Sequence, residues 1–178
     1  MAQPQLALLR ELDVAPLFLW DNYNNAITRA ETAYLLVNIF EQLNRTRVDT
    51  SGSEFTDIEN HILESGIKKA FNLSFINGVS AEIFNPDAFV TRQEAATMIC
   101  NYIARVEKLT IPTGSRNLAF YADAGQISGW AAPYVTYAHE NNIMQGSGGN
   151  FEPRSNITRE QMLIIIYRLI EKYEWVKG

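Results

Sequence analysis

Ile157-Thr158-Arg159-Glu160-Gln161 is the third copy in this chain of one short pattern, in which Thr-Arg follows a β-branched residue and opens an apolar run. The earlier copies are Ile27-Thr28-Arg29-Ala30-Glu31 and Val90-Thr91-Arg92-Gln93-Glu94. Their threonines are 63 and then 67 residues apart. A single Thr-x-x-Glu only predicts the start of a helix. Three copies at nearly constant spacing indicate that one structural unit is repeated, and this repeat decides the fold.

Each copy has the chemistry of a helix N-terminus. The threonine hydroxyl is expected to accept a backbone N–H, and the side chain three residues later is expected to accept the threonine's own N–H, as in a capping box. The predicted capping residues are Thr28, Glu31, Thr91, Glu94, Thr158 and Gln161. A pair of glycosidase carboxylates is the alternative for Glu31 and Glu94, but capping accounts better for their shared position in the first turn.

The helices that follow are apolar on almost every side. The third reads Met162-Leu163-Ile164-Ile165-Ile166-Tyr167, and the first contains Tyr34-Leu35-Leu36-Val37. A helix that is apolar all round must be buried all round. We therefore expect these three helices to meet at a common centre, each flanked by the first helix of its own unit.

Units two and three share further features upstream of the Thr-Arg pair. Each has an aromatic–acidic start, a first helix over 62–73 or 130–141, a glycine turn and a Phe-x-Pro loop. The matching segments are Phe55-Thr56-Asp57 with Phe120-Tyr121-Ala122-Asp123, Gly78 with Gly146, and Phe84-Asn85-Pro86 with Phe151-Glu152-Pro153. Unit one is abbreviated: its first helix is predicted over 5–12, and Trp20-Asp21-Asn22 stands where the Phe-x-Pro loop belongs.

Composition limits the classes of function. The 178 residues carry a net charge of −5, so no basic surface for a nucleic-acid partner is expected. Cys100 is the single cysteine, and His61 and His139 stand apart from other ligand-type residues, so neither a disulfide nor a metal site is predicted. No run approaches the ~20 apolar residues that cross a bilayer, so membrane insertion is not expected. No signal peptide is recognised, and an export signal would lie outside this chain.

With these features in order, residues 120–170 resemble an S-layer homology repeat, unit two is similar with gaps, and unit one matches mainly over 27–43. The resemblance implies an all-α fold of three helix–loop–helix repeats in a pseudo-threefold arrangement around a central helical bundle. It also implies a single domain over 1–178, with repeats of about 1–50, 54–110 and 118–175.

The resemblance further implies non-covalent anchoring of an exported bacterial protein to the cell wall, at the cell surface and without catalysis or a cofactor. The expected partner is a secondary cell-wall polysaccharide, often pyruvylated, that binds in grooves between adjacent repeats. Other surface domains are expected to be fused to the module. The residues expected to bind the ligand are Arg29, Arg92, Arg159, Trp130, Asp123 and Gly146.

The chemistry of these residues suits an acidic glycan. A helix start offers unpaired N–H groups and a partial positive charge, and an arginine there fits a carboxylate bidentately. Trp130 offers a flat face to a sugar ring, and Gly146 would let backbone approach the glycan. Unit two has Ile62 in place of Trp130, so not every groove is expected to bind.

Structural alternatives stay open for these residues. Each arginine either binds ligand or pairs with a nearby acid such as Asp57 or Asp123, and the two aspartates either serve the site or cap the first helices. Trp130 is either an exposed sugar platform or an aromatic of the core or of an interface. For the whole chain, the main alternative is a protein-interaction or oligomerisation module on the same scaffold. A glycan-cleaving enzyme is a third class, for which no acid/base pair is evident.

Overall fold

The computed structural model describes residues 3–114 and 117–176. These residues form helices connected by loops, with a few isolated β-bridges between the loops and no β-strand. The predicted all-α class is confirmed. The helices are α1 (Gln3–Glu11), α2 (Arg29–Asn44), α3 (Glu64–Asn72), α4 (Arg92–Val106), α5 (Ala132–Glu140) and α6 (Arg159–Lys172), with short 3₁₀ turns at Leu17–Leu19 and Ala124–Gln126. The predicted domain ends at 1 and 178, and the start of the first repeat, lie outside the described residues.

Three backbone hydrogen bonds join the units in a ring. The N–H of Ile27 donates to the carbonyl of Ile157 at 3.0 Å, that of Ile157 to Val90 at 2.9 Å, and that of Val90 back to Ile27 at 3.0 Å. All three side chains are fully buried. The β-branched residue of each motif copy therefore lies where the three units meet, just before each helix begins.

A second set of backbone bonds repeats this order. The first N–H of α2 donates to the loop before α4, that of α4 to the loop before α6, and that of α6 to the loop before α2, each at 2.9 Å. The donor–acceptor pairs are Arg29 with Ala88, Arg92 with Ser155, and Arg159 with Asn25. These N–H groups are among those that a helix cannot satisfy internally. Each unit thus caps the helix of its neighbour, while the pseudo-threefold arrangement of whole units stays a prediction.

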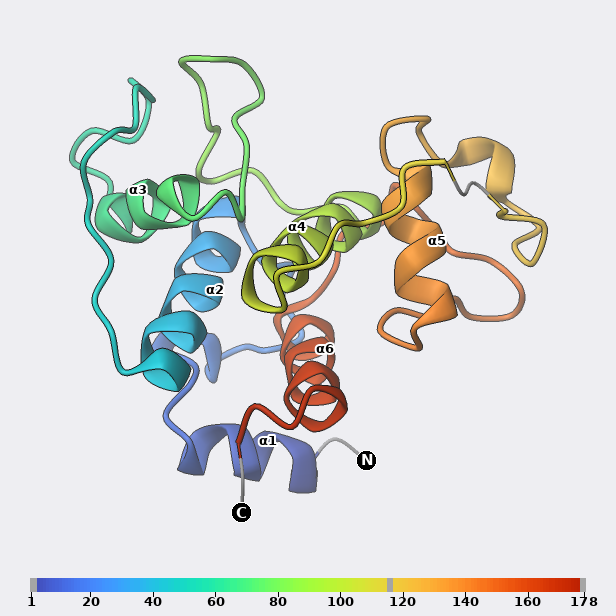
Figure 1. The fold of residues 1–178 in the computed structure, drawn as a ribbon, viewed down its shortest axis with the longest axis horizontal. Coiled ribbons are helices and arrows are strands. Elements are labelled where there is room, and N and C mark those ends of the chain that lie inside the picture. Colours follow the sequence, from blue (N-terminus) through green and yellow to red (C-terminus); the bar gives the residue numbers. More distant parts are fainter. Residues whose placement is uncertain (1–2, 115–116, 177–178) are drawn as a thin grey trace.

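The helices pack across the units. The short helix α3 lies against α2, α5 lies against α4, and α1 lies against α6 (Figure 1). The expectation that each long helix is flanked by the first helix of its own unit is therefore wrong, because the flanking helix comes from the next unit around the ring. The physical reason is that each long helix is held at its start by the next unit's loop, which brings it beside that unit's first helix.

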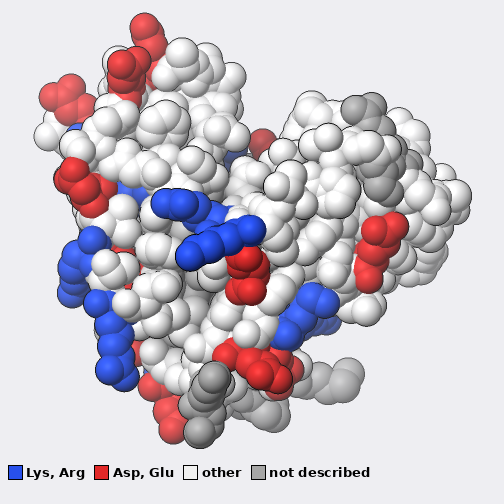
Figure 2. Space-filling view, viewed as in Figure 1, with Lys and Arg blue, Asp and Glu red and all other residues white. Residues whose placement is uncertain are grey.

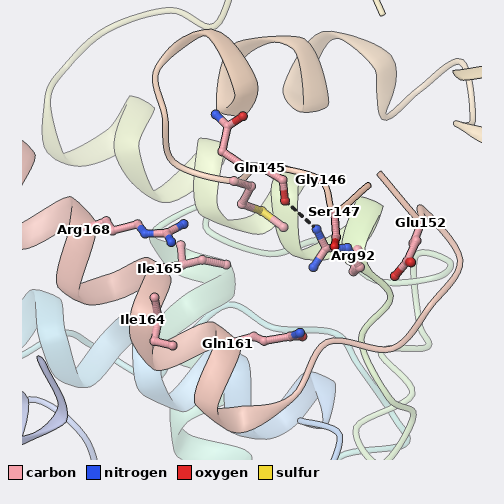
Figure 3. A pocket seen from close by; sticks show the side chains of 10 residues that line it. Arg92, Gln145, Gly146, Ser147, Glu152, Gln161, Ile164, Ile165 and Arg168 are labelled. Atoms are coloured by element: carbon pink, nitrogen blue, oxygen red, sulfur yellow. Dashed lines mark hydrogen bonds between the residues drawn. The ribbon is translucent and has the colours of Figure 1, made fainter. Parts of the chain in front are cut away.

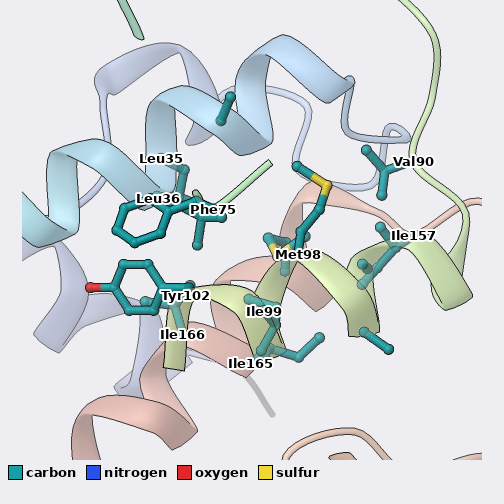
Figure 4. Close-up of a cluster of buried hydrophobic side chains, with 14 of the residues drawn as sticks. Leu35, Leu36, Phe75, Val90, Met98, Ile99, Tyr102, Ile157, Ile165 and Ile166 are labelled. Atoms are coloured by element: carbon teal, nitrogen blue, oxygen red, sulfur yellow. The ribbon is translucent and has the colours of Figure 1, made fainter. Parts of the chain in front are cut away.

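The long helices share an apolar core. Side chains from α2, α4 and α6 converge in it (Figure 4), among them Leu36, Ile99 and Ile166, which are fully buried. Phe75 packs beside Tyr102, with ring centroids 4.7 Å apart. Burying one aliphatic side chain of this size contributes about 1.5–3 kcal/mol. The expected common centre is present.

The described surface carries both signs of charge. On the face drawn in Figure 2, acidic and basic side chains are interspersed over the described residues and do not gather into one basic area. This pattern fits the net charge of −5. None of the described helices is long and apolar enough to cross a membrane.

Candidate functional site: grooves between the units

Every copy of the Thr-Arg motif forms a capping box. In α2 the N–H of Thr28 donates to Glu31 Oε2 at 3.1 Å, and the N–H of Glu31 donates to Thr28 Oγ1 at 3.1 Å. Helix α6 has the same box, with Gln161 in the place of Glu31. In α4 both the N–H and the hydroxyl of Thr91 donate to Glu94 Oε2, at 2.8 and 2.6 Å. Capping fixes the backbone at each start, so the arginine that follows has a defined position. Because Glu31 and Glu94 are engaged in the boxes of different helices, the glycosidase alternative lacks support.

The helix starts do not offer free N–H groups. In α2 the first N–H, from Arg29, donates to Ala88, and the second, from Ala30, donates to Pro86 at 3.0 Å. The third N–H is used by the capping box. Helices α4 and α6 repeat the pattern with the loops of their own neighbours. The expectation that a glycan meets unpaired N–H groups is therefore wrong, because the neighbouring unit already occupies them.

The guanidinium group of Arg29 reaches into unit two. Its Nε donates to the carbonyl of Phe84 at 2.8 Å and its Nη2 to that of Asn77 at 2.9 Å, while its Cζ lies 4.7 Å from the Phe84 ring centroid. Nη1 lies 3.7 Å from Glu94 Oε1, so its ion-pair partner is Glu94 rather than Asp57. Burial lowers the pKa of Arg29 against the opposing effect of the Glu94 carboxylate, and the group remains a cation.

Arg92 repeats these contacts one unit later. Its Nε donates to the carbonyl of Phe151 at 2.7 Å and its Nη2 to that of Gln145 at 3.0 Å, with Cζ 5.1 Å from the Phe151 ring centroid. Burial lowers the pKa of Arg92 as well. Unlike Arg29, however, Arg92 is only partly buried. The two arginines thus serve one structural purpose, and Arg92 is the more accessible.

Asp123 and Asp57 hold the Phe-x-Pro loops that these arginines bind. Asp123 accepts the N–H groups of Phe151 and Glu152 at 2.8 and 2.7 Å, and Asp57 accepts the equivalent pair in unit two at 2.9 and 2.6 Å. The alternative in which they cap the first helices is wrong, because α3 and α5 begin without a side-chain cap. Each carboxylate oxygen of Asp123 accepts one of these N–H groups, so the role of Asp123 is to fix the conformation of the loop.

Arg159 differs from the other two arginines. Its Nε donates to Glu31 Oε2 at 3.2 Å, its Nη2 bonds the other oxygen of that carboxylate, and its Nη1 donates to the carbonyl of Asp21 at 2.9 Å. Unit one lacks the Phe-x-Pro sequence, and the carbonyl of Asp21 belongs to the Trp20-Asp21-Asn22 segment that stands in its place. The side chains of Arg159 and Glu31 are 17% and 10% exposed, so a bidentate ion pair closes the junction between units three and one.

Among the described residues, two grooves between the units contain a motif arginine. The first groove, of about 460 Å³, is formed by units one and two, with one aromatic residue from unit three. Its lining includes Arg29, Gly78, Glu94, Met98, Asn101 and Trp130. The second groove, of about 240 Å³, is formed by units two and three (Figure 3). Its lining includes Arg92, Gly146, Glu152, Gln161, Ile165 and Arg168. The arginine, the glycine turn and the following helix occupy matching places in both grooves.

Trp130 is an exposed residue of the first groove. Its exposed fraction is 53%, so it is not an aromatic of the core. It lines a groove formed by the other two units, which follows from the packing of α5 against α4. Its counterpart Ile62 is 93% exposed.

Gly146 and Gly78 are required by their own turns. A Cβ at Gly146 would lie 2.0 Å from the carbonyl oxygen of Asn150 and 2.6 Å from the Tyr121 ring. At Gly78 it would lie 2.2 Å from the carbonyl oxygen of Ser80. Gly146 does line the second groove, but the close approach that demands a glycine there is made by the chain itself.

The groove residues on the second and third turns of the long helices were not among the predicted site residues. Asn101 lies seven residues after Glu94, and Arg168 lies seven residues after Gln161. Seven residues are two helical turns, so each pair lies on one face. This spacing is visible in the sequence, but nothing in the sequence says that the face borders a groove.

Residues 54–96 and 120–163 match the S-layer homology domain. Units two and three are S-layer homology repeats. A surface-layer 125 kDa protein of Lysinibacillus sphaericus is 28% identical over 161 residues, which is 86% of this chain and 13% of that protein. A cellulosome-anchoring protein of Acetivibrio thermocellus is 29% identical over 99 residues, 55% of this chain and 21% of that protein. An amylopullulanase of Thermoanaerobacterium thermosulfurigenes is 26% identical over 153 residues, 84% of this chain and 8% of that protein.

The S-layer homology segments contain the features that build the grooves. Both include the acidic start, the glycine turn, the Phe-x-Pro loop and the Thr-Arg pair. The chain spans only 8–21% of the length of the three relatives. In the amylopullulanase the matching segment makes up 8% of the length, so most of that protein lies outside the match.

Proposed function

We propose that the chain is a non-catalytic module that anchors an exported bacterial protein to the cell wall by binding a secondary cell-wall polysaccharide. The observation that carries the proposal is the pair of matching grooves, each with a motif arginine beside a glycine turn. The S-layer homology match supports it, as do relatives named surface-layer and cellulosome-anchoring proteins. The protein is expected outside the cell, as part of a larger surface protein.

The groove residues have distinct roles in this proposal. The exposed ring of Trp130 stacks on a sugar face, a contact that aromatic side chains make through their apolar surface. Arg92 uses two of its five N–H groups on backbone carbonyls, which leaves donors for a glycan carboxylate such as that of a pyruvylated sugar. Arg29 is only 7% exposed and acts chiefly by holding the loop of unit two. Arg159 receives no ligand role, because Glu31 already matches its charge.

Co-sedimentation with native wall sacculi tests this function. The unmodified chain is expected in the pellet, and the double variant Arg92→Ala, Trp130→Ala in the supernatant. Arg105→Ala is the matched control, because Arg105 is exposed on α4 and does not line either groove. Full pelleting of the double variant would remove these two residues from the mechanism.

The same assay separates the remaining alternatives. An unmodified chain that stays in the supernatant would favour the protein-interaction module. Released reducing sugar, measured on the same sacculi, would favour a glycan-cleaving enzyme, and none is expected from a module whose glutamates cap helices.

A further inference from the structure

The two grooves have matching backbones but different charges at matching positions. The capping residue is Glu94 in the first groove and Gln161 in the second. Two turns further along the helix, Asn101 of the first groove is replaced by Arg168 in the second. Both differences make the second groove more positive, because Gln161 is uncharged and Arg168 is a cation, and together they outweigh the one acid that this groove has, Glu152.

The first groove is close to neutral. Its charged lining residues are Arg29 and Glu94, whose Nη1 and Oε1 atoms lie 3.7 Å apart. Arg29 is also mostly buried and bonded to two carbonyls of unit two. A ligand in this groove therefore meets the exposed ring of Trp130 and the amide of Asn101, but little uncompensated charge.

The second groove has an excess of positive charge. Arg92 and Arg168 line it together with one acid, Glu152. Figure 3 shows Arg168 and Glu152 on opposite sides of the groove. Arg168 is exposed, and its Nη1 makes one long bond of 3.4 Å to the carbonyl of Ile143. Its guanidinium group is therefore available to a ligand.

The capping amide of Gln161 adds donors to this groove. Its Oε1 accepts the N–H of Thr158 at 3.1 Å, which leaves the NH₂ end for other partners. Glu94, in the same place, presents carboxylate oxygens that repel an anion. The exchange of glutamate for glutamine thus keeps the helix cap and removes the repulsion.

We propose that only the second groove selects an anionic saccharide group, a carboxylate or a phosphate, and that Arg168 is its specificity-determining residue beside Arg92. The first groove then takes an uncharged sugar face against Trp130. This inference rests on the proposed glycan-binding function. Arg92 and Arg168 both line this groove, so the second cation raises its selectivity for an anionic ligand as well as its affinity.

Calorimetric titration of the full chain tests the inference with purified wall polysaccharide in three forms. One is untreated, one has lost its pyruvyl ketals to mild acid, and one has lost its phosphates to hydrofluoric acid. The first variant is Arg168→Asn, which gives the second groove the residue that the first groove has at this position. Its matched control is Arg105→Asn, because Arg105 is an exposed arginine outside both grooves and the change in charge is the same. The second variant is the reverse exchange, Glu94→Gln with Asn101→Arg. Each substituted residue is the one that the other groove has at the matching position. Thermal melts verify that the variants fold.

We expect Arg168→Asn to weaken binding of the untreated polysaccharide about tenfold, and the control to leave it unchanged. The reverse exchange should add binding of the anionic form at the first groove. Loss of binding after mild acid identifies a carboxylate, and loss after hydrofluoric acid identifies a phosphate.

Two results would overturn the inference while leaving the proposed function intact. One is undiminished binding by Arg168→Asn, and the other is equal binding of all three forms by the unmodified chain. If the unmodified chain binds none of the forms, the proposed function itself fails, and the inference fails with it.

Discussion

Replacing Arg29 by methionine should cost more stability than the same replacement at Arg92, although the two arginines make matching contacts. Arg29 is 7% exposed and donates to the carbonyls of Phe84 and Asn77. Its removal leaves both carbonyls unpaired in a largely buried place, at about 1–3 kcal/mol each, and leaves Glu94 without its cation. Methionine can still cover the aromatic ring, so the lost bonds account for most of the change. We expect a loss of about 3 kcal/mol in the free energy of unfolding.

At Arg92 the expected loss is about 1 kcal/mol, because water can reach the carbonyls that the partly buried side chain leaves behind. Urea unfolding followed by far-ultraviolet circular dichroism measures both values, and Arg105→Met should stay within about 0.5 kcal/mol of the unmodified chain. An equal loss at both arginines, or a larger one at Arg92, would refute the argument from burial.

Three further predictions concern the turns, the junction between units three and one, and acid stability. Gly146→Ala should lower the free energy of unfolding by about 3 kcal/mol or more. Gly125→Ala is the control, because a Cβ there meets nothing within 4 Å, and it should hardly change the melting temperature. Equal melting temperatures for the two variants would contradict this. Arg159→Met should cost about 3–5 kcal/mol because Glu31 is left largely buried and unpaired, and a double-mutant cycle with Glu31→Gln should give a coupling well above zero. Burial alone would raise the pKa of Glu41, but a backbone N–H and a lysine outweigh it and hold the pKa below the ordinary value of a glutamate. Its stabilising effect is thus present above the unfolded-state pKa and lost as the pH falls through the lower folded-state pKa, so Glu41→Gln should flatten the acid limb of stability measured by urea unfolding, and an unchanged limb would contradict the assignment.

The repeated motif was sufficient to predict the three long helices and their starts. Thr-x-x-Glu chemistry is local, so the capping box of Thr28 and Glu31 can be inferred without knowing the rest of the fold. The pairing of helices could not be inferred in this way. A helix that is apolar on all sides, such as α6, reports that it is buried, but not which helix covers it. That choice depends on long-range backbone bonds such as the one from Ile27 to Ile157.

The candidate site was predicted only in outline. The motif predicted that the arginines lie at the junctions between units. Their hydrogen-bond acceptors, however, are backbone carbonyls and, for Arg159, the carboxylate of Glu31. A sequence does not reveal how much of a charged side chain is used within the protein. Likewise, Arg168 resembles any other exposed residue of an amphipathic helix until the neighbouring unit is placed beside it.

The bonds from Ile27 to Ile157, Ile157 to Val90 and Val90 to Ile27 leave no unit with a free edge. In an open solenoid another repeat can stack on the last one, and special end repeats are needed to stop growth. Here the neighbour of the last unit is the first, so removal of any one copy would break two of these three bonds. Loss of a single copy is therefore expected to destabilise the two that remain, and it should be selected against during evolution of the gene.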